Sequence, residues 1–239
     1  MLLEGKTALI TGAGRGIGKG IALAFAKAGC DIAAVARTGP EVERTAVEVG
    51  ALGRESMAAT CDVADGAAVE RTVAAVLDAF GTIDILVNNA GYACFKPFEA
   101  LSIQEWHRTL DVNLTAAFLM TRAVLPSMKK HRSGRIINIS SVAGLKPIEH
   151  QSAYCASKYA LNGLTKVLAL ELREHNIAVH AICPGGVDTQ LAREAMPERD
   201  RTQWMIPEDV AHTALYLATL SPRAATDEIL VRRFASTPL

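Results

Sequence analysis

The chain has 239 residues, half of them hydrophobic but only 5% aromatic, and its 25 basic residues balance its 25 acidic residues. The length suits one large α/β domain. The sequence has no basic stripe that would bind nucleic acid and no apolar run of about 20 residues that would span a membrane. Five widely spaced cysteines without a CxxC pair predict no metal site and no disulfide framework. The start lacks a secretory pattern, so we expect a cytoplasmic protein.

Short apolar runs alternate with helical patterns along the whole chain. The expected strands are residues 7–11, 32–36, 56–60, 83–87, 135–139, 177–182 and 228–231. The expected helices are residues 17–28, 41–49, 67–80, 103–110, 113–130, 152–174 and 207–220. This alternation is typical of a doubly wound, mostly parallel sheet with helices on both faces. No linker or repeat divides the chain, so we expect one α/β domain over residues 1–239 with a seven-stranded sheet.

A glycine-rich turn joins the first expected strand to the first expected helix and reads Thr11-Gly12-Ala13-Gly14-Arg15-Gly16-Ile17-Gly18. Gly12, Gly16 and Gly18 follow the spacing GxxxGxG, which lets the backbone approach a pyrophosphate at the positive end of the helix. Glycines also occur in tight turns for conformational reasons alone. The position between a strand and a helix favours a dinucleotide site.

The end of the second expected strand indicates which dinucleotide binds. A carboxylate there would bind the ribose 2′-hydroxyl and repel a 2′-phosphate, but this chain has Ala36 followed by Arg37. Arg15, in the glycine-rich turn, adds a second guanidinium on the same side, and both can form charge-assisted hydrogen bonds to a phosphate. The alternative interpretation is that Arg37 is an ordinary solvated residue after a strand and binds no phosphate. The pattern predicts NADP(H), with NAD(H) as the alternative.

Tyr154 and Lys158 lie four residues apart at the start of a long expected helix, so their side chains share one helix face. A tyrosine hydroxyl titrates near ~10, too high for a base at neutral pH, and a neighbouring ammonium favours its ionised form. This spacing also occurs by chance on half-exposed helices. Ser141 follows the fifth expected strand, thirteen positions before Tyr154. Because parallel strands end at one edge of the sheet, we expect Ser141 and the glycine-rich turn in one crevice.

Further motifs follow in a characteristic order: Asn88-Asn89-Ala90-Gly91, Asp111-Val112-Asn113-Leu114, Ser141, Tyr154 with Lys158, and Pro184-Gly185. From Gly5 to about Val210 the sequence therefore resembles the short-chain dehydrogenase/reductase family, of the type that includes 3-oxoacyl-[acyl-carrier-protein] reductases. The resemblance implies a single Rossmann-like domain that transfers hydride between a nicotinamide cofactor and a carbonyl or secondary alcohol.

The resemblance also implies cofactor-binding residues. The pyrophosphate and the adjoining ribose would be held by Thr11, Gly12, Gly16, Ile17 and Gly18. The adenine would contact Asp62 and the backbone of Val63, although Asp62 also suits a turn after the third strand. The middle of the cofactor would lie against Asn89, Ala90 and Gly91, with Asn88 structural. The nicotinamide would contact Pro184, Gly185, Val187 and Thr189.

By the same resemblance, Tyr154 is the proton donor in reduction and Ser141 hydrogen-bonds the substrate oxygen. Lys158 binds the nicotinamide ribose and lowers the tyrosine pKa. Asn113 holds a water in the proton relay, although a helix cap after Asp111 is an alternative role. These roles agree with the chemistry, because hydride transfer to a carbonyl builds negative charge on oxygen, which needs hydrogen-bond donors and a proton nearby.

Two segments depart from the family pattern. Residues 189–206, called here the covering segment, are a short and highly charged form of the part that usually closes over substrate, so we expect a more open site. A truncated but ordered segment is the alternative. Residues 226–234 lack the usual Asn-x-Asp-Gly-Gly turn of a region that often contributes to a subunit interface.

The two long helices carry apolar residues beyond what the sheet can cover, which predicts a homodimer or homotetramer. Examples are Leu114, Phe118, Tyr159, Leu161 and Leu168. Substrate contacts are expected after strands that face the crevice, at Tyr92, Cys94, Phe95, Ile148, Glu149 and His150. For His150, an ordinary surface-loop position is the alternative.

The leading functional hypothesis is an NADP(H)-dependent reductase of small-molecule carbonyls, with 3-oxoacyl thioesters as the substrates that the resemblance implies. An NAD(P)-dependent dehydrogenase of a sugar, polyol or hydroxy acid is the second hypothesis. A cofactor-sensing protein without chemistry is the third. The complete set of Ser141, Tyr154 and Lys158 argues against the third, because a protein that only binds the cofactor has no need of the tyrosine.

Overall fold

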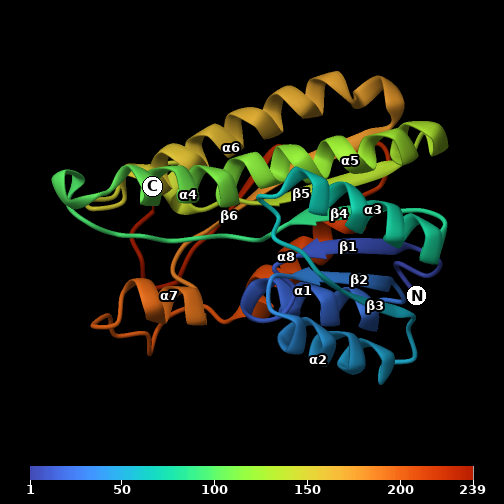
Figure 1. Ribbon diagram of the computed structural model, residues 1–239, viewed down its shortest axis with the longest axis horizontal. Coiled ribbons are helices and arrows are strands. Elements are labelled where there is room, and N and C mark those ends of the chain that lie inside the picture. The colour runs from blue at the N-terminus through green and yellow to red at the C-terminus, as the bar shows by residue number, and fades with distance from the viewer. Residues whose placement is uncertain (239) are drawn as a thin grey trace.

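Seven strands form one sheet in the order β3-β2-β1-β4-β5-β6-β7 in the computed structural model, which describes residues 1–238 (Figure 1). The strands are β1 (Thr7–Thr11), β2 (Asp31–Ala36), β3 (Ser56–Thr60), β4 (Ile85–Asn88), β5 (Gly134–Ile139), β6 (Ile177–Pro184) and β7 (Glu228–Val231). Every neighbouring pair is parallel. The doubly wound sheet predicted from the sequence is confirmed.

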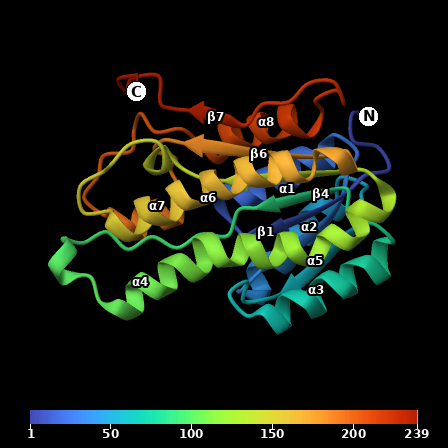
Figure 2. The ribbon, with the colours of Figure 1, turned by 90° about the horizontal axis from the view of Figure 1, so that it is seen from above.

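Helices cover both faces of this sheet (Figures 1 and 2). They are α1 (Gly16–Lys27), α2 (Gly39–Gly50), α3 (Gly66–Phe80), α4 (Ile103–Leu110), α5 (Ala116–His131), α6 (Ser152–Glu171), α7 (Gln190–Ala195) and α8 (Pro207–Ala218). The first two and α8 pack on one face, and α3, α5 and α6 pack on the other. No helix among residues 1–238 is long and apolar enough to cross a membrane.

The central strands are apolar on both sides because each side contacts a different layer of helices. In β1, Ala8 and Ile10 belong to the core beneath α1 and α8, whereas Leu9 belongs to the core beneath α3 and α5. The alternation follows from the two-residue period of a strand. These two cores fix the strands in register, so all seven strands end along one edge of the sheet.

Three parts of the chain differ from the sequence-based expectation. The helix expected from residue 113 begins instead with a π-turn, Asp111–Thr115, and α5 follows it. The long helix α6 ends at Glu171 and is followed by a separate 3-10 turn, Arg173–His175. Helix α7, in the covering segment, was not predicted. None of these differences changes the sheet order.

The expected apolar surface on α5 and α6 is partly present. The side chains of Phe118 and Tyr159 are both 45% exposed, whereas Leu161 is buried at 1%. Leu168 is half-buried against the core on that face of the sheet. Counting the two leucines as surface residues was wrong, because α6 turns that face toward the sheet.

Candidate active site

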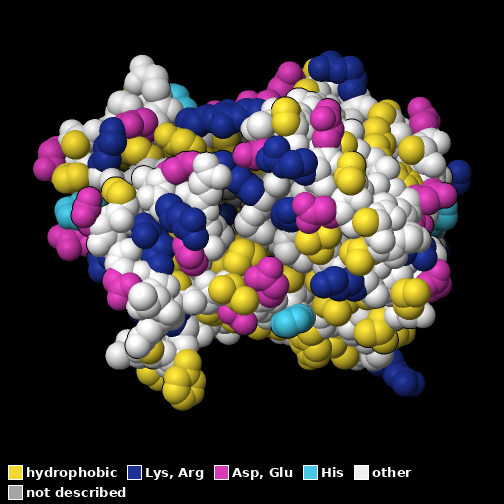
Figure 3. Space-filling view, turned by 90° about the horizontal axis from the view of Figure 1, so that it is seen from below, with side chains coloured by type: hydrophobic (Ala, Val, Ile, Leu, Met, Phe, Trp, Pro, Cys, Tyr) yellow, Lys and Arg dark blue, Asp and Glu magenta, His cyan; other side chains and the backbone are white. Residues whose placement is uncertain are grey.

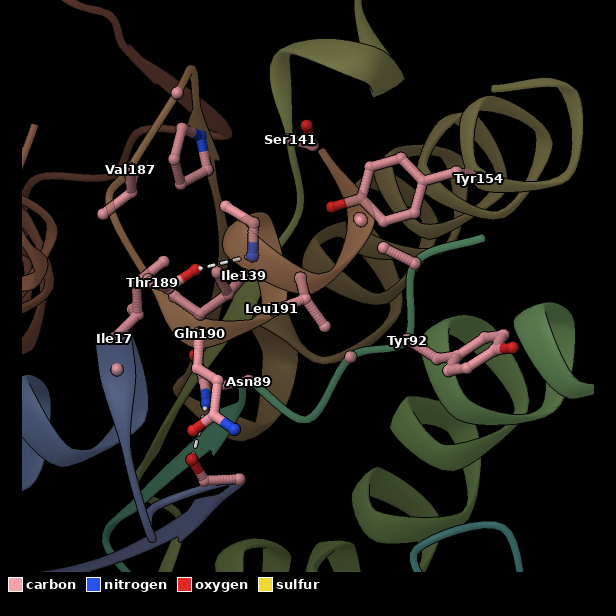
Figure 4. Close-up of a pocket in the computed structure, with 18 of the residues that line it drawn as sticks. Ile17, Asn89, Tyr92, Ile139, Ser141, Tyr154, Val187, Thr189, Gln190 and Leu191 are labelled. Carbon is pink, nitrogen blue, oxygen red and sulfur yellow. Dashed lines mark hydrogen bonds between the residues drawn. The ribbon is translucent and has the colours of Figure 1, made fainter. Parts of the chain in front are cut away.

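The ends of the strands open into one large cavity of about 690 Å³, which Figure 4 shows in part. Its walls are the glycine-rich turn after β1, the segments that follow β2, β3, β4, β5, β6 and β7, and helix α7. Ligands of doubly wound sheets bind at this edge, and cavities of several hundred Å³ are typical of small-molecule sites. The cavity therefore gathers most of the residues singled out in the sequence.

The glycine-rich turn has the shape of a phosphate cradle. Gly12 and Gly16 have φ values of 63° and 56°, which favour glycine, and both line the cavity. A Cβ at Gly12 would lie 2.8 Å from the side-chain nitrogen of Asn89. Helix α1 begins without a side-chain cap or an acidic residue in its first turn, so its first amides remain available for an anion. The turn fits a pyrophosphate.

Thr11 and Gly18 lie behind the cavity wall rather than in it. The Thr11 hydroxyl accepts hydrogen bonds from the backbone N–H groups of Asn89 and Ala90 at 2.9 and 3.0 Å. It donates to the carbonyl oxygen of Val87 at 3.3 Å. A Cβ at Gly18 would collide with the carbonyl oxygen of Gly12. Thr11 and Gly18 therefore shape the turn from behind the cavity wall.

The end of β2 presents one unpaired cation. Ala36 and Arg37 both line the cavity, and no carboxylate among residues 1–238 lies within ion-pair distance of Arg37. Arg15 differs, because its guanidinium lies 3.5 Å from a carboxylate oxygen of Glu41 and 3.9 Å from one of Glu194. Neither carboxylate was expected beside Arg15 from the sequence.

Asp62 and Val63 line the same half of the cavity. Asp62 accepts a hydrogen bond from the Ala64 N–H at 3.0 Å and lies 3.3 Å from the Arg108 guanidinium. Burial acts to raise the pKa of Asp62, but the Ala64 bond and the Arg108 charge outweigh it and hold the pKa below its usual value. Asp62 thus makes the turn contact that the sequence left as an alternative, while it also faces the cavity.

Ser141, Tyr154 and Lys158 meet at the other half of the cavity. Figure 4 shows Ser141 near Tyr154, whose hydroxyl points into the cavity. The ring of Tyr154 packs edge-on against Phe95, with 5.4 Å between centroids. Lys158 is only 3% exposed and donates a hydrogen bond to the carbonyl oxygen of Ile139 at 2.9 Å. Two hydroxyls and one ammonium therefore converge beside the end of β5.

Burial dominates the titration of this group. It raises the pKa of Tyr154 to about 12, against the opposing effect of the Ser141 hydroxyl. It lowers the pKa of Lys158 to about 8. The resemblance implies a lower tyrosine pKa, but here the loss of solvation outweighs every stabilising contact. Tyr154 is therefore neutral at neutral pH and carries a proton that it can donate.

Asn113 lies in the π-turn between α4 and α5 and is 2% exposed. Its amide nitrogen donates to the Tyr92 carbonyl at 3.0 Å and to the Ser157 hydroxyl at 3.1 Å, and its oxygen accepts from the Tyr92 N–H at 2.8 Å. It does not line the main cavity. With Lys158 and Ile139 it lines a second cavity of about 10 Å³, close to the size of one water.

The nicotinamide side of the cavity has the residues that the resemblance implied, Pro184, Gly185, Val187 and Thr189. The covering segment is compact, because Val187 pairs with Met205 and the Trp204 ring lies 3.0 Å from the Cβ position of Gly186. The Thr189 hydroxyl accepts a hydrogen bond from the Ala192 N–H and caps α7. Thr189 followed by helix-forming residues was the sequence signal for α7.

Of the expected substrate contacts, Tyr92, Phe95 and Ile148 line the cavity, but Cys94, Glu149 and His150 do not. The backbone of His150 has φ 62°. Its side chain is 53% exposed and lies 3.7 Å from Glu149. The structure therefore does not bring His150 or Cys94 to the cavity wall, and for His150 the distance in sequence from Tyr154 does not reveal the direction of a loop side chain. Sequence reasoning also missed Lys146, Arg199, Arg232 and Arg233, which line the cavity.

Residues 6–200 match the protein family described as short chain dehydrogenase. The chain belongs to the short-chain dehydrogenase/reductase family. It is therefore an NAD(P)-dependent oxidoreductase that acts on CH–OH groups and the corresponding carbonyls.

Relatives of known name have different substrates. D-threitol dehydrogenase of Mycolicibacterium smegmatis is 40% identical over 226 residues, which cover 91% of this chain and 87% of the relative. The 3-oxoacyl-[acyl-carrier-protein] reductase of Synechocystis sp. is 38% identical over 229 residues, covering 93% and 92%.

Similar solved structures include complexes with both cofactors. A metagenomic short-chain oxidoreductase in complex with NADP is 36% identical, with a TM-score of 0.86 over 98% of this chain and 99% of that one. The 3-ketoacyl-(acyl-carrier-protein) reductase of Brucella melitensis, complexed with NADH, is 35% identical with a TM-score of 0.89 over 96% and 98%. The expectation of a nicotinamide cofactor is confirmed.

Proposed function

We propose that this protein is an NADP(H)-dependent reductase of small carbonyl compounds and that Tyr154 supplies the proton. The observation that carries this proposal is the meeting of the Tyr154 and Ser141 hydroxyls with the buried Lys158 in one cavity. A bound nicotinamide would supply hydride in reduction and accept it in oxidation. Gly12, Gly16 and Ile17 would hold its pyrophosphate end.

Each residue around Tyr154 has a separate role in stabilising charge or moving the proton during reduction. Ser141 donates a hydrogen bond to the carbonyl oxygen and stabilises the negative charge that develops there. Tyr154 gives its proton to the same oxygen, which completes the alcohol. Lys158 orients the nicotinamide ribose and replaces the tyrosine proton. Asn113, across the small cavity from Lys158, positions a water that connects the lysine to solvent.

The preference for NADP(H) rests on Ala36 and Arg37. The chain lacks a carboxylate where one would repel a 2′-phosphate, and it presents an unpaired guanidinium beside that position. Asp62 and Val63 would contact the adenine, and Asn89, Ala90 and Gly91 the middle of the cofactor. Arg15 is a secondary contact, because Glu41 and Glu194 already neutralise part of its charge.

The first candidate substrate class is 3-oxoacyl thioesters, which is supported by the relatives named as reductases of such compounds. The second candidate class is hydroxy acids or polyols, which the enzyme would oxidise as a dehydrogenase. It is supported by D-threitol dehydrogenase and by the D-beta-hydroxybutyrate dehydrogenase of Rhizobium meliloti, which is 39% identical over 212 residues. An assay of 3-oxoacyl thioesters, keto acids, ketones, polyols and hydroxy acids with NADPH, NADH and their oxidised forms tests the proposal. No turnover with any of these pairs would overturn it.

We also propose a homodimer or homotetramer assembled through α5 and α6. On α6, Tyr159, Val167 and Leu170 are 45%, 51% and 71% exposed and follow one another at helical spacing. Phe118 of α5 is 45% exposed. Exposed apolar stripes on helices are stabilised by pairing with a second copy.

A further inference from the structure

The chain after β7 forms part of the cavity wall. Residues 232–237, called here the C-terminal tail, contribute Arg232, Arg233, Ser236 and Thr237 to it. The tail is held beside the end of β6, where the Gly185 N–H donates to the Val231 carbonyl at 2.8 Å. A Cβ on Gly185 would lie 3.5 Å from the Cα of Arg232. The tail therefore borders the segment that the nicotinamide would contact.

The position of the tail separates it from the cofactor phosphates. Arg37 follows β2 and Arg232 follows β7, which lie five strands apart in the sheet, or about 24 Å at a spacing of about 4.8 Å. Ser141 follows β5, only two strands from β7, or about 10 Å. The tail arginines are thus placed for the substrate and not for the 2′-phosphate.

Positive charge gathers at this end of the cavity. Lys146, Arg199, Arg232 and Arg233 all line it, and Figure 3 shows Lys and Arg side chains around the hollow on this face. No carboxylate in the described chain lies within ion-pair distance of any of the four. The 25 basic and 25 acidic residues of the chain balance, so this local excess is a property of the site.

Two other charged residues of the covering segment, Arg193 and Asp200, already have an ion-pair or hydrogen-bond partner. Arg193 lies 2.8 Å from Asp188, and Arg193 does not line the cavity. Asp200 is the carboxylate of the covering segment that does line it, and it accepts hydrogen bonds from the backbone and hydroxyl of Thr202, both at 3.0 Å. Arg199 and Arg233 thus line this end of the cavity without a carboxylate partner among residues 1–238, whereas Arg193 has one.

The two tail arginines are held in position before any ligand binds. Arg232 donates from Nη1 to the carbonyl oxygen of Ser236 at 2.5 Å, which closes the tail into a turn. The guanidinium carbon of Arg233 lies 5.7 Å from the centre of the Trp204 ring, a cation–π distance. Trp204 in turn packs on Gly186. Both arginines are half-buried, and a guanidinium fixed in this way loses less entropy when it binds an anion.

We propose that the substrate is an oxo acid or hydroxy acid whose carboxylate binds the C-terminal tail and the covering segment, through Arg233 and Arg199. The carbonyl would then lie at Ser141 and Tyr154. A guanidinium forms short, charge-assisted and often bidentate hydrogen bonds to a carboxylate. The inference rests on the proposed function and narrows it to the acids of the second substrate class, because neither the acyl group of a thioester nor a neutral polyol offers these cations a carboxylate.

The test uses acids and their methyl esters, which differ only in the charge. The probes are 3-oxobutanoate, 4-oxopentanoate and 5-oxohexanoate, each with its methyl ester, reduced with NADPH. The three lengths vary the distance between carbonyl and carboxylate. We expect kcat/KM for the best acid to exceed that of its ester by about tenfold or more, the effect of one charge-assisted hydrogen bond. Added salt should reduce the ratio, because partly exposed charges are screened.

Variants assign the effect to the arginines. Arg233→Ala and Arg199→Ala should each raise KM for the acid by about tenfold, with a smaller effect on the ester and no effect on NADPH affinity. Arg233→Lys should restore part of the preference. Arg223→Ala is the control, because Arg223 is exposed and does not line the cavity.

Equal kcat/KM for acids and esters, or an acid preference that survives in both alanine variants, would overturn the inference while leaving the reductase proposal standing. Absence of turnover with every acid, ester and neutral ketone, although NADPH binds, would overturn the proposed function itself and the inference with it.

Discussion

The ammonium nitrogen of Lys158 lies 5.7 Å from the centre of the Tyr154 ring. Burial moves the two groups in opposite directions, lowering the pKa of the lysine to about 8 and raising that of the tyrosine to about 12. Both shifts favour the neutral side chain. At neutral pH the phenol of Tyr154 is therefore protonated, as the proposed reduction requires. The neighbouring Lys158 amine gains and loses its proton near neutral pH.

Tyr154→Phe should lower kcat for reduction by a factor on the order of 10² or more, because it removes the proposed proton donor. Affinity for NADPH should remain nearly unchanged. Steady-state kinetics and nucleotide titration by fluorescence measure the two effects. Tyr159→Phe is the matched control, since Tyr159 is exposed on the same helix. Near-full activity of the Tyr154 variant would show that another group donates the proton.

The buried Lys158 predicts a stability that depends on pH. Its pKa is about 8 in the folded chain against a usual 10.5, so the unfolded chain binds more protons between these values. Stability therefore rises with pH in that window. Lys158→Met lacks this effect, so from pH 7 to pH 9.5 wild type should gain about 2 kcal/mol relative to the variant. Urea unfolding at several pH values measures it. Lys130→Met, at an exposed position, is the control, and a pH-independent difference for Lys158→Met would contradict the prediction.

Arg37 should decide the choice of cofactor. Arg37→Ala should weaken NADPH binding by roughly tenfold to a hundredfold and leave NADH almost unchanged. Arg15→Ala should have a smaller effect, because Glu41 and Glu194 lie beside Arg15. Ala36→Asp should reverse the preference. Titrations of both nucleotides check these outcomes, with exposed Arg44 changed to alanine as the control. Equal wild-type affinities would favour the NAD-dependent alternative.

Asn113 should matter for both folding and turnover. Asn113→Ala removes three hydrogen bonds of a buried amide and should lower the free energy of unfolding by about 1–3 kcal/mol. Asn113→Asp keeps the acceptor for the Tyr92 N–H but loses both donors. If the amide also positions a water next to Lys158, kcat should fall in both variants while NADPH affinity holds. Unfolding curves and kinetics run side by side separate these effects, and unchanged kcat would leave Asn113 a purely structural residue.

Oligomerisation should depend on the exposed stripe of α6. Leu170→Glu places a charge where the side chain is 71% exposed, so it should leave the fold intact but dissociate the assembly. Sedimentation velocity at micromolar concentration measures the change. Val47→Glu, on a different helix and 72% exposed, is the control. A wild-type monomer under these conditions would contradict the proposal.

Local patterns were enough to predict the sheet. Strands such as Thr7–Thr11 and Ile85–Asn88 are buried throughout, and continuous apolar runs of this length have few other structures available to them. The glycine-rich turn was equally readable, because the φ values of Gly12 and Gly16 suit few residues other than glycine. Tyr154 and Lys158 followed from helical spacing. In each case the information lies within a few neighbouring residues.

Other parts of the site depend on contacts that sequence spacing does not encode. His150 precedes Tyr154 by four residues, but a left-handed backbone at φ 62° turns it away from the cavity. The Asn113 side chain, in the π-turn, bonds to Tyr92 and Ser157, which are distant in the chain. Arg233 reaches the cavity because of its contact with Trp204. Long-range packing of loops decided each of these positions.

The location of the C-terminal tail bears on how the protein should be handled and altered. The N-terminus and the C-terminus lie at opposite ends of the molecule (Figures 1 and 2), and only the tail borders the cavity. Any segment attached directly after the tail would therefore extend from the mouth of the cavity, whereas one attached before Met1 would not. Conversely, residues 232–237 are a compact target for changing which compounds the enzyme accepts, since the nucleotide-binding turn lies elsewhere in the chain.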